Sequence, residues 1–188
     1  MSDDRSTSTN GRVFWTAAVA VVVLDVITKW LAEHYLEPFR PTPVVGSVAR
    51  LTLVFNRGAA FSMSLGNYSR LIFGAFAVIA IVILWRLYRQ SPVGETKRVL
   101  ALGLAWGGAA GNLIDRIRSG RGVVDFIDIG VGNVRFWTFN VADSAVTIGA
   151  LLLAWVLWQE DRRSIRRRGV AEAGKGKATP ELEERTGT

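Results

Sequence analysis

Residues 111–116 read Gly-Asn-Leu-Ile-Asp-Arg and close an apolar run with an amide, an acid and a base. Two related stretches follow: Val-Val-Asp-Phe at 123–126, and Phe-Asn-Val-Ala-Asp at 139–143, which opens another apolar run. A carboxylate at the edge of hydrocarbon is costly, so its presence there indicates a function and a charged or polar partner. These stretches therefore place the candidate chemistry at the ends of apolar helices.

Four uncharged apolar runs dominate the chain, which has 188 residues, 49% of them hydrophobic, and a mean hydropathy of +0.24. Each run is shorter than the roughly 20 residues that a spanning helix needs, but flanking Arg and Trp side chains can extend it into the headgroups. Too few polar residues remain to cover four buried soluble helices. The sequence predicts an all-α membrane protein with four transmembrane helices, on the runs Val13–Leu24, Leu71–Trp85, Val99–Ile114 and Ser144–Trp158.

The distribution of basic residues predicts the orientation. We expect the first run to be retained rather than cleaved, because no small-residue cleavage site follows it closely. Of the 23 Lys and Arg residues, 14 fall in the two ends and the 86–98 loop, and 8 fall in and beside the 33–69 and 115–138 segments. The positive-inside rule then places both termini in the cytoplasm and the other two segments outside.

Polar ends flank the apolar region. Residues 1–12 are rich in Ser, Thr and Asp, and residues 161–188 are charged. Both are expected to be disordered because they cannot bury enough apolar surface, which leaves 13–160 as one transmembrane domain. The net charge of +7 resides mainly in the tail and indicates contact with anionic membrane lipids rather than nucleic acid.

The two outward segments carry strand patterns. Residues 47–55 are β-branched and partly alternating, whereas residues 122–129 lead into a Gly-rich turn and a return at 134–137. The sequence therefore predicts a small extracytoplasmic β-sheet over the mouth of the helix bundle.

The residue types narrow the chemistry. The chain has no cysteine and a single histidine, His34. Thiol catalysis and disulfides are excluded, and the usual ligands of a zinc site are missing. We expect no metal and no cofactor.

Several polar groups at the membrane edge are candidates for a site. Asp25 and Lys29 lie four residues apart on one helix face, as an ion pair that makes the charges tolerable there or that also supports an active-site loop. Asn56 and Gly58 follow the first strand, where a bare turn would look similar. Asp115 next to Arg116 is typical of a local charge pair.

The acids Asp115, Asp125 and Asp128 are the outward candidates for chemistry, and Asp143 lies three residues after Asn140. A helix cap is the structural alternative for Asn140 or Asp143. Two carboxylates held close together cannot both ionise, so one keeps its proton while the other activates a water that attacks a peptide carbonyl. Such a pair needs no metal and no cysteine.

Other classes of protein remain as alternatives. Paired intramembrane acids also mark small transporters and proton relays, although here the ionisable groups gather at one membrane face. An assembly factor without catalysis would leave the clustered motifs unexplained. A serine protease using Ser62 or Ser64 with Lys29 would need a neutral lysine, which pairing with Asp25 opposes.

Five blocks in register resemble the motif set of the bacterial lipoprotein signal peptidase, signal peptidase II. They cover residues 13–158 in the expected order, and five together are far more specific than any one. The blocks are Asp25-x-x-x-Lys29, Asn56-x-Gly58-Ala59-Ala60-Phe61, Gly111-Asn112-x-x-Asp115-Arg116, Val123-Val124-Asp125-Phe126 and Phe139-Asn140-x-Ala142-Asp143.

The resemblance implies an intramembrane aspartic endopeptidase of the plasma (inner) membrane. It would remove the signal peptide from diacylglyceryl-modified prolipoproteins, cutting before the lipidated cysteine near the extracytoplasmic face. Asp125 and Asp143 would be the catalytic pair, and globomycin-type inhibitors would occupy the site. We expect a monomer. The supporting residues would be Asp25, Lys29, Asn56, Gly58, Asn112, Asp115, Arg116 and Asn140.

Overall fold

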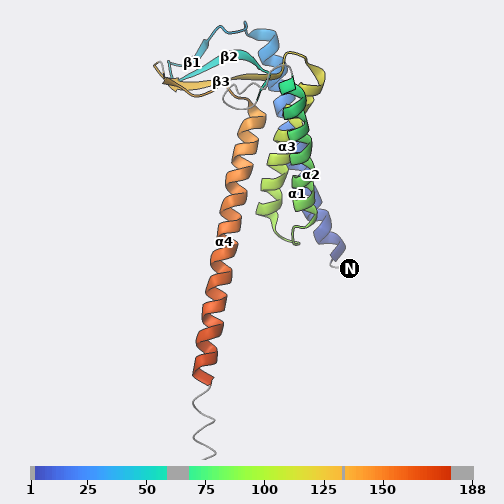
Figure 1. Cartoon of the computed structure of the whole chain (residues 1–188), viewed down its shortest axis with the longest axis vertical. Helices are drawn as coiled ribbons and strands as arrows, with labels where there is room; N and C mark the ends of the chain where they lie inside the picture. Colours follow the sequence, from blue (N-terminus) through green and yellow to red (C-terminus); the bar gives the residue numbers. More distant parts are fainter. Residues whose placement is uncertain (1–2, 59–67, 133, 179–188) are drawn as a thin grey trace, which may run out of the picture.

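The computed structural model describes residues 3–58, 68–132 and 134–178, which form four helices and a small sheet. Figure 1 shows the helices side by side beneath the sheet, with α4 extending far beyond the others. The helices are α1 (Asp3–Tyr35), α2 (Ser69–Arg89), α3 (Thr96–Arg118) and α4 (Val141–Ala178). The strands are β1 (Thr42–Val45), β2 (Ala49–Asn56), β3 (Val123–Val131) and β4 (Val134–Arg135).

Helix α3 contacts each of the other three helices, and its glycines make this possible. A Cβ atom at Gly103 or Gly107 would lie 2.7 Å from a backbone carbonyl oxygen of α1. At Gly108 a Cβ atom would collide with the carbonyl of Ala142 in α4. The small residues of α3 therefore allow close helix packing.

The surfaces of the other helices are suited to lipid. Within the described residues, three segments are long and apolar enough to cross a membrane: Thr9–Tyr35, Ser69–Arg89 and Val141–Arg166. They expose large apolar side chains, among them Phe76 at 58% and Leu151 at 68%, which a water-facing surface would not tolerate in such number. These features indicate a multi-pass membrane protein.

Helical backbone extends into both ends for which the sequence predicts disorder. Helix α1 begins within the 1–12 leader, and Asn10 Nδ2 donates to the Pro92 carbonyl at 3.1 Å, so this part of the leader packs against the α2–α3 connection. Helix α4 continues through the 161–188 tail as far as Ala178. The helical part of the tail contains five Arg and three Ala residues, which favour helix without needing a core.

The sheet is antiparallel with the order β1-β2-β3-β4. Strands β2 and β3 and the return at β4 confirm the predicted pattern. Strand β1 was not predicted; it contains Pro43, which lacks a backbone N–H but is accommodated in an edge strand. The sheet rests on the end of α1 through a small apolar core of Ala32, Leu53, Val124 and Phe126.

Candidate active site

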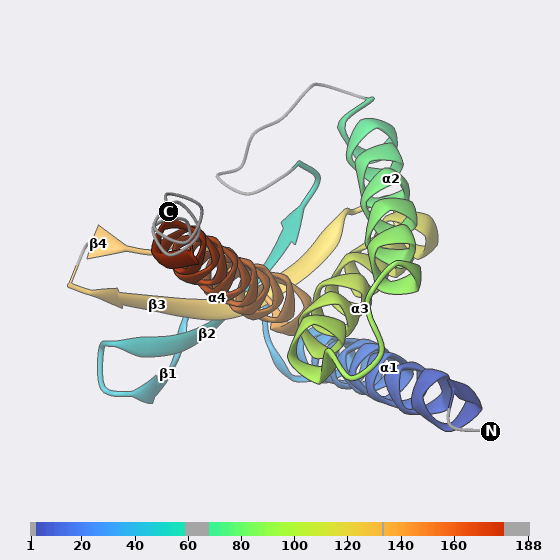
Figure 2. The same ribbon diagram turned by 90° about the horizontal axis from the view of Figure 1, so that it is seen from below.

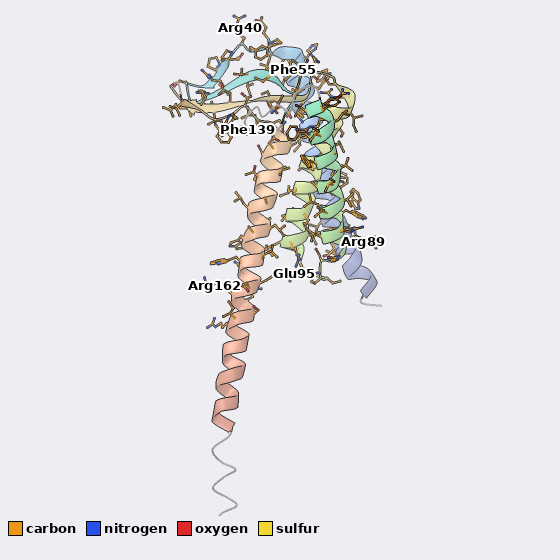
Figure 3. The ribbon with its side chains drawn as sticks, in the orientation of Figure 1. Arg40, Phe55, Arg89, Glu95, Phe139 and Arg162 are labelled. Atoms are coloured by element: carbon orange, nitrogen blue, oxygen red, sulfur yellow. The ribbon has the colours of Figure 1, made fainter. Side chains whose placement is uncertain are left out.

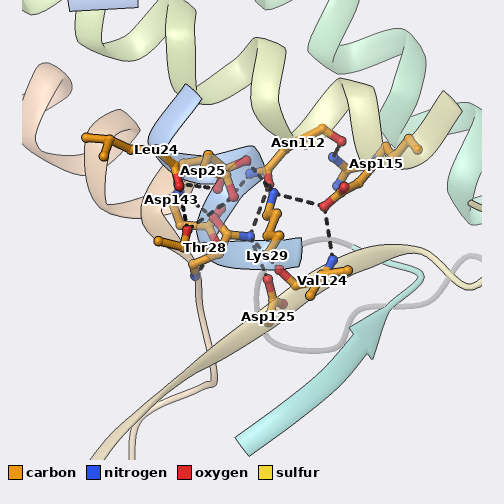
Figure 4. A network of polar contacts seen from close by, with 12 residues as sticks. Leu24, Asp25, Thr28, Lys29, Asn112, Asp115, Val124, Asp125 and Asp143 are labelled. Carbon is orange, nitrogen blue, oxygen red and sulfur yellow. Dashed lines mark hydrogen bonds and ion pairs between the residues drawn. The ribbon is translucent and has the colours of Figure 1, made fainter. Parts of the chain in front are cut away.

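A buried lysine lies at the centre of the polar network between the helices and the sheet. Lys29 is 1% exposed, and its Nζ lies 2.7 Å from Asp25 Oδ2 and 2.9 Å from Asp115 Oδ2. It also donates to Asn112 Oδ1 at 3.0 Å. Figure 4 shows these contacts converging on Lys29. The Asp25–Lys29 ion pair predicted from the sequence is confirmed, and the charge on Lys29 is balanced by two carboxylates.

Both acids also bind backbone groups of other elements. Asp25 Oδ1 accepts the N–H of Ala142 at 2.9 Å, in the first turn of α4. Asp115 Oδ2 accepts the N–H of Val124 at 3.1 Å, in β3. The acid–base cluster therefore joins α1 and α3 to the start of α4 and to β3, the two elements that carry Asp143 and Asp125.

The partner of Asp115 differs from the one expected. The predicted ion pair between Asp115 and Arg116 is wrong. Asp115 pairs instead with Lys29 and, at 2.9 Å, with Arg118. Arg116 donates instead to the carbonyls of Asn112 at 3.1 Å and Gly58 at 3.2 Å. On a helix, residues three or four apart share a face, whereas adjacent residues point in different directions.

Helix α4 begins with a reciprocal cap. Asn140 Oδ1 accepts the N–H of Asp143 at 2.9 Å, and Asp143 Oδ2 accepts the N–H of Asn140 at 3.2 Å. This is a capping box, so the capping alternative considered from the sequence is realised. The cap uses Oδ2 of Asp143, so Oδ1 can bind a partner on another helix.

Two asparagines connect the carboxylates. Asn112 Nδ2 donates to Asp143 Oδ1 at 2.7 Å. Asn140 Nδ2 donates to Asp125 Oδ1 at 2.7 Å and to Asn112 Oδ1 at 3.1 Å. Because Asn140 binds Asp125 through its side-chain amide and Asp143 through its cap, it fixes the position of each acid relative to the other.

Asp125 is held from its other side by Asn56, whose Nδ2 donates to Asp125 Oδ2 at 3.1 Å. The carbonyl of the same amide accepts the N–H of Gly58 at 2.9 Å. This second bond orients the amide so that its nitrogen, and not its oxygen, faces the carboxylate. Asn56 and Gly58 thus act together.

Burial, and then the charge of Asp143, raise the pKa of Asp125 from 3.8 to about 7. The hydrogen bonds from Asn56 and Asn140 act in the opposite direction but do not cancel these effects. Near neutral pH Asp125 therefore holds a proton for much of the time.

Both acids open on one pocket of about 1170 Å³. Asn56, Asn112 and Arg116 line its polar side. Its apolar side includes Phe136, Trp137, Phe139, Val146 and Ile148, from the segment before α4 and from α4 itself. The pocket thus combines two paired carboxylates with an apolar wall.

Asp128 lines the same pocket, but its carboxylate forms ion pairs with two arginines. Its carboxylate lies 2.8 Å from Arg50 on β2 and 2.8 Å from Arg135 on β4, and it accepts a bond from Thr52 at 3.1 Å. Burial would raise the pKa of Asp128, but the bonds from these partners hold it below its usual value. Of the outward acids, Asp128 and Asp115 are therefore tied into ion pairs, whereas Asp125 is not.

Sequence reasoning missed the arginine partners of Asp128 and the aromatic wall. Simple alternation would separate Asp125 from Asp128, but the pairing of β3 is irregular between them. The N–H groups of Phe126 and Ile127 both donate to the Phe139 carbonyl, at 3.1 and 2.8 Å, and the β2–β3 register shifts between Leu51 and Val54. The alternative nucleophiles Ser62 and Ser64, and the Ala59–Phe61 part of one motif, lie outside the described residues.

Comparison with known proteins identifies the family of the chain. The family described as Signal peptidase (SPase) II matches residues 17–159. A lipoprotein signal peptidase from Moorella thermoacetica is 40% identical over 145 residues, which cover 77% of this chain and 91% of the relative. One from Francisella tularensis subsp. novicida is 36% identical over 143 residues, 74% of this chain and 88% of the relative.

A solved structure of a bacterial membrane enzyme, obtained by the in meso method at 2.3 Å resolution, has the same fold. It superposes with a TM-score of 0.71 at 30% sequence identity and covers 78% of this chain and 87% of its own. Sequence and fold lead to the same conclusion: the chain belongs to the signal peptidase II family, the lipoprotein signal peptidases.

Proposed function

We propose that this chain is an aspartic endopeptidase that removes the signal peptide from diacylglyceryl-modified prolipoproteins, cutting before the lipidated cysteine. The observation that carries the proposal is the pair of Asp125 and Asp143, joined through Asn140 and opening on one pocket. The lipoprotein signal peptidases that this chain resembles support the choice of substrate.

In the proposed reaction the two acids activate one water. Ionised Asp143 takes a proton from the water, whose oxygen attacks the scissile carbonyl carbon, while protonated Asp125 gives its proton to the carbonyl oxygen. The tetrahedral intermediate then collapses: Asp125 recovers its proton from the hydroxyl, the C–N bond breaks, and Asp143 gives its proton to the cysteine nitrogen. The raised pKa of Asp125 suits the acid role.

Three side chains support these steps without exchanging protons. Asn112 holds Asp143 and is itself held by Lys29. Arg116 lines the pocket and is attracted electrostatically to Asp143 and Asp125. Its positive charge would stabilise the single negative charge of the dyad as that charge passes from Asp143 to Asp125.

We further propose that all four helices cross the plasma (inner) membrane, α3 included, with both termini in the cytoplasm. Three cation–aromatic pairs lie toward the helix ends remote from the sheet: Arg89 at 5.8 Å from Trp85, Lys97 at 4.8 Å from Trp155 and Arg162 at 4.8 Å from Trp158. Figure 3 shows Arg89 and Arg162 far from Phe139 at the sheet. Such pairs suit a membrane interface on the basic, cytoplasmic side.

This orientation places the dyad near the extracytoplasmic face, where the pocket can receive its substrate from the bilayer. A pocket of about 1170 Å³ exceeds the usual size of a small-molecule site, and its apolar wall suits a signal helix and an acylated cysteine. Membrane lipids would surround the enzyme, which we expect to act as a monomer. Globomycin-type inhibitors would compete for the pocket.

The test is cleavage by the purified chain in detergent micelles. A prolipoprotein that carries diacylglyceryl on its cysteine should be cut, and product masses should place the cut before that cysteine. The same precursor without lipid should be cut far more slowly. If the chain cuts neither precursor but moves protons across vesicles, the transporter alternative replaces this proposal.

A further inference from the structure

One end of the sheet exposes apolar side chains on three of its strands and on the segment that leads to α4. Their exposed fractions are larger than a water-facing sheet normally shows. The residues are Val44 at 61%, Val45 at 63%, Val131 at 71%, Val134 at 81%, Phe136 at 58% and Trp137 at 48%.

Strand register gathers these residues at the end of the sheet remote from α1, α2 and α3. Val45 pairs with Ala49 at the start of β2, and Val131 pairs with Val134 where β3 turns into β4. At the opposite end, Asn56 pairs with Val123 next to the helices. Figure 2 shows the β1–β2 and β3–β4 connections together on the side away from α1, α2 and α3.

The position of this end of the sheet relative to the bilayer can be inferred from its position relative to α4. Figure 1 shows the sheet crossing above the start of α4. Ile148, 56% exposed, follows the first residue of α4 by two turns, which is about 10 Å along the axis. The headgroup layer on each side of a bilayer is about 5–8 Å thick. With Ile148 at the edge of the hydrocarbon, the exposed end of the sheet would lie at headgroup depth.

A cluster of charged side chains next to the apolar end also favours a position among the lipid headgroups. Arg50 and Arg135 share the single carboxylate of Asp128, so the cluster carries one surplus positive charge. Their side chains are 28% and 16% exposed. Apolar and aromatic residues in front of a cationic group are the pattern of segments that lie in a membrane interface, because lipid phosphates attract the charge.

We propose that this end of the sheet inserts into the headgroup region of the bilayer and acts as a membrane anchor separate from the helices. The inference rests on the membrane placement of the helices and not on the cleavage reaction. Because Asp125 lies on the same strand as Val131, the anchor would also fix the height of the dyad relative to the lipid surface.

The absence of cysteine in the chain permits a clean test with one label per protein. We would introduce Val134→Cys, Arg40→Cys and Leu151→Cys separately, attach an environment-sensitive fluorophore, and reconstitute each full chain in phosphatidylcholine–phosphatidylglycerol vesicles. Arg40 lies on the sheet side away from the helices and is 73% exposed, so it should report water (Figure 3). Leu151 is the hydrocarbon reference. The label at position 134 should show blue-shifted emission and be quenched by nitroxide on lipid headgroups.

A second variant tests whether the apolar side chains of β3 and β4 cause the contact with the lipid headgroups. With Val131→Ser and Val134→Ser together, a label at Val45→Cys should lose quenching by headgroup nitroxide, while the Leu151 label stays unchanged. The proposal is overturned if the label at position 134 matches the Arg40 label. It is also overturned if that label is shielded from soluble quencher yet untouched by lipid nitroxide, since a protein partner or a second copy would then cover the surface. None of these readouts depends on cleavage.

Discussion

The two ends of the helix bundle are held together by opposite means. Near the sheet, Lys29 and its partners join the helices through charges and amides. At the other end, Phe14 stacks on Tyr88 with ring centroids 4.1 Å apart and meets Trp85 and Trp106 edge-on. The first cluster contains a lysine and two carboxylates, whereas the second is held by the packing of aromatic rings.

The difference matters more in a bilayer than it would in water. Lipid tails can replace aromatic packing at modest cost, because they are as apolar as the rings they displace. They cannot replace the partners of a buried Lys29 or Asp25. The polar end should therefore contribute more to the specificity of the fold, and it also positions the dyad.

The largest effect is expected from the dyad itself. Asp125→Asn and Asp143→Asn keep the shape of each side chain but remove its ability to ionise, so each should lower turnover of lipid-modified prolipoprotein by about 10³-fold or more. The double variant should be little worse than either single one, because both acids serve one water. Purified variants matched for helix content would be compared.

Asp115→Asn is the matched control for this pair. It changes a buried acid of the same network that lies outside the pocket lining, so some turnover should remain. Strong activity in Asp125→Asn with none in Asp115→Asn would transfer the catalytic role to Asp115. Normal activity in Asp143→Asn would exclude the aspartate mechanism.

Much of this end of the bundle could be predicted from sequence. Helix periodicity places Asp25 and Lys29 together, and the spacing of Asn140 and Asp143 matches a cap. The links across elements could not be predicted, because Asn112 to Asp143 and Asn140 to Asp125 depend on how three elements pack. The length of α4 was also missed, since helical propensity acts beyond the apolar run.

The next largest effect is expected on stability, from a substitution at the polar end of the bundle. Lys29→Met should leave Asp25 and Asp115 without their shared counterion and lower the free energy of unfolding by about 3–5 kcal/mol. Thermal unfolding in detergent would measure it. Adding Asp25→Asn should recover part of the loss, because one buried charge fewer remains. An unchanged melting temperature in Lys29→Met would show that this charge is not needed for stability.

Phe14→Ala tests the aromatic end in the same assay. The ring is fully buried, yet lipid can occupy part of the space, so we expect a loss of about 1–3 kcal/mol, below that of Lys29→Met. Turnover per folded molecule should stay close to that of the parent chain. If Phe14→Ala destabilises more than Lys29→Met, the comparison between the two ends is reversed.

A smaller effect is expected from pH. Because the pKa of folded Asp125 is about 7, turnover should fall as pH rises above 7, roughly tenfold per pH unit once the proton is lost. Asp125 binds its proton more tightly when folded, so its contribution to stability is greatest below pH 3.8 and is lost as pH rises to about 7. Asp128→Asn is the control: that carboxylate has a lowered pKa, so its removal should not shift the midpoint of this fall.

The smallest effect is expected at the end of α4. The signal peptidase II match ends at residue 159, and residues 161–166 of α4 are exposed. A chain that ends at Arg168 should therefore insert and turn over substrate within about twofold of the full chain, because no part of the site or bundle is removed. A chain that ends at Ala154 should lose both properties, since it lacks Trp155 beside Lys97 and the buried Val156. Turnover in proteoliposomes would compare the two. If the chain ending at Arg168 inserts but no longer cleaves, the tail supports the reaction from the opposite side of the membrane, and the site is larger than the polar end of the bundle.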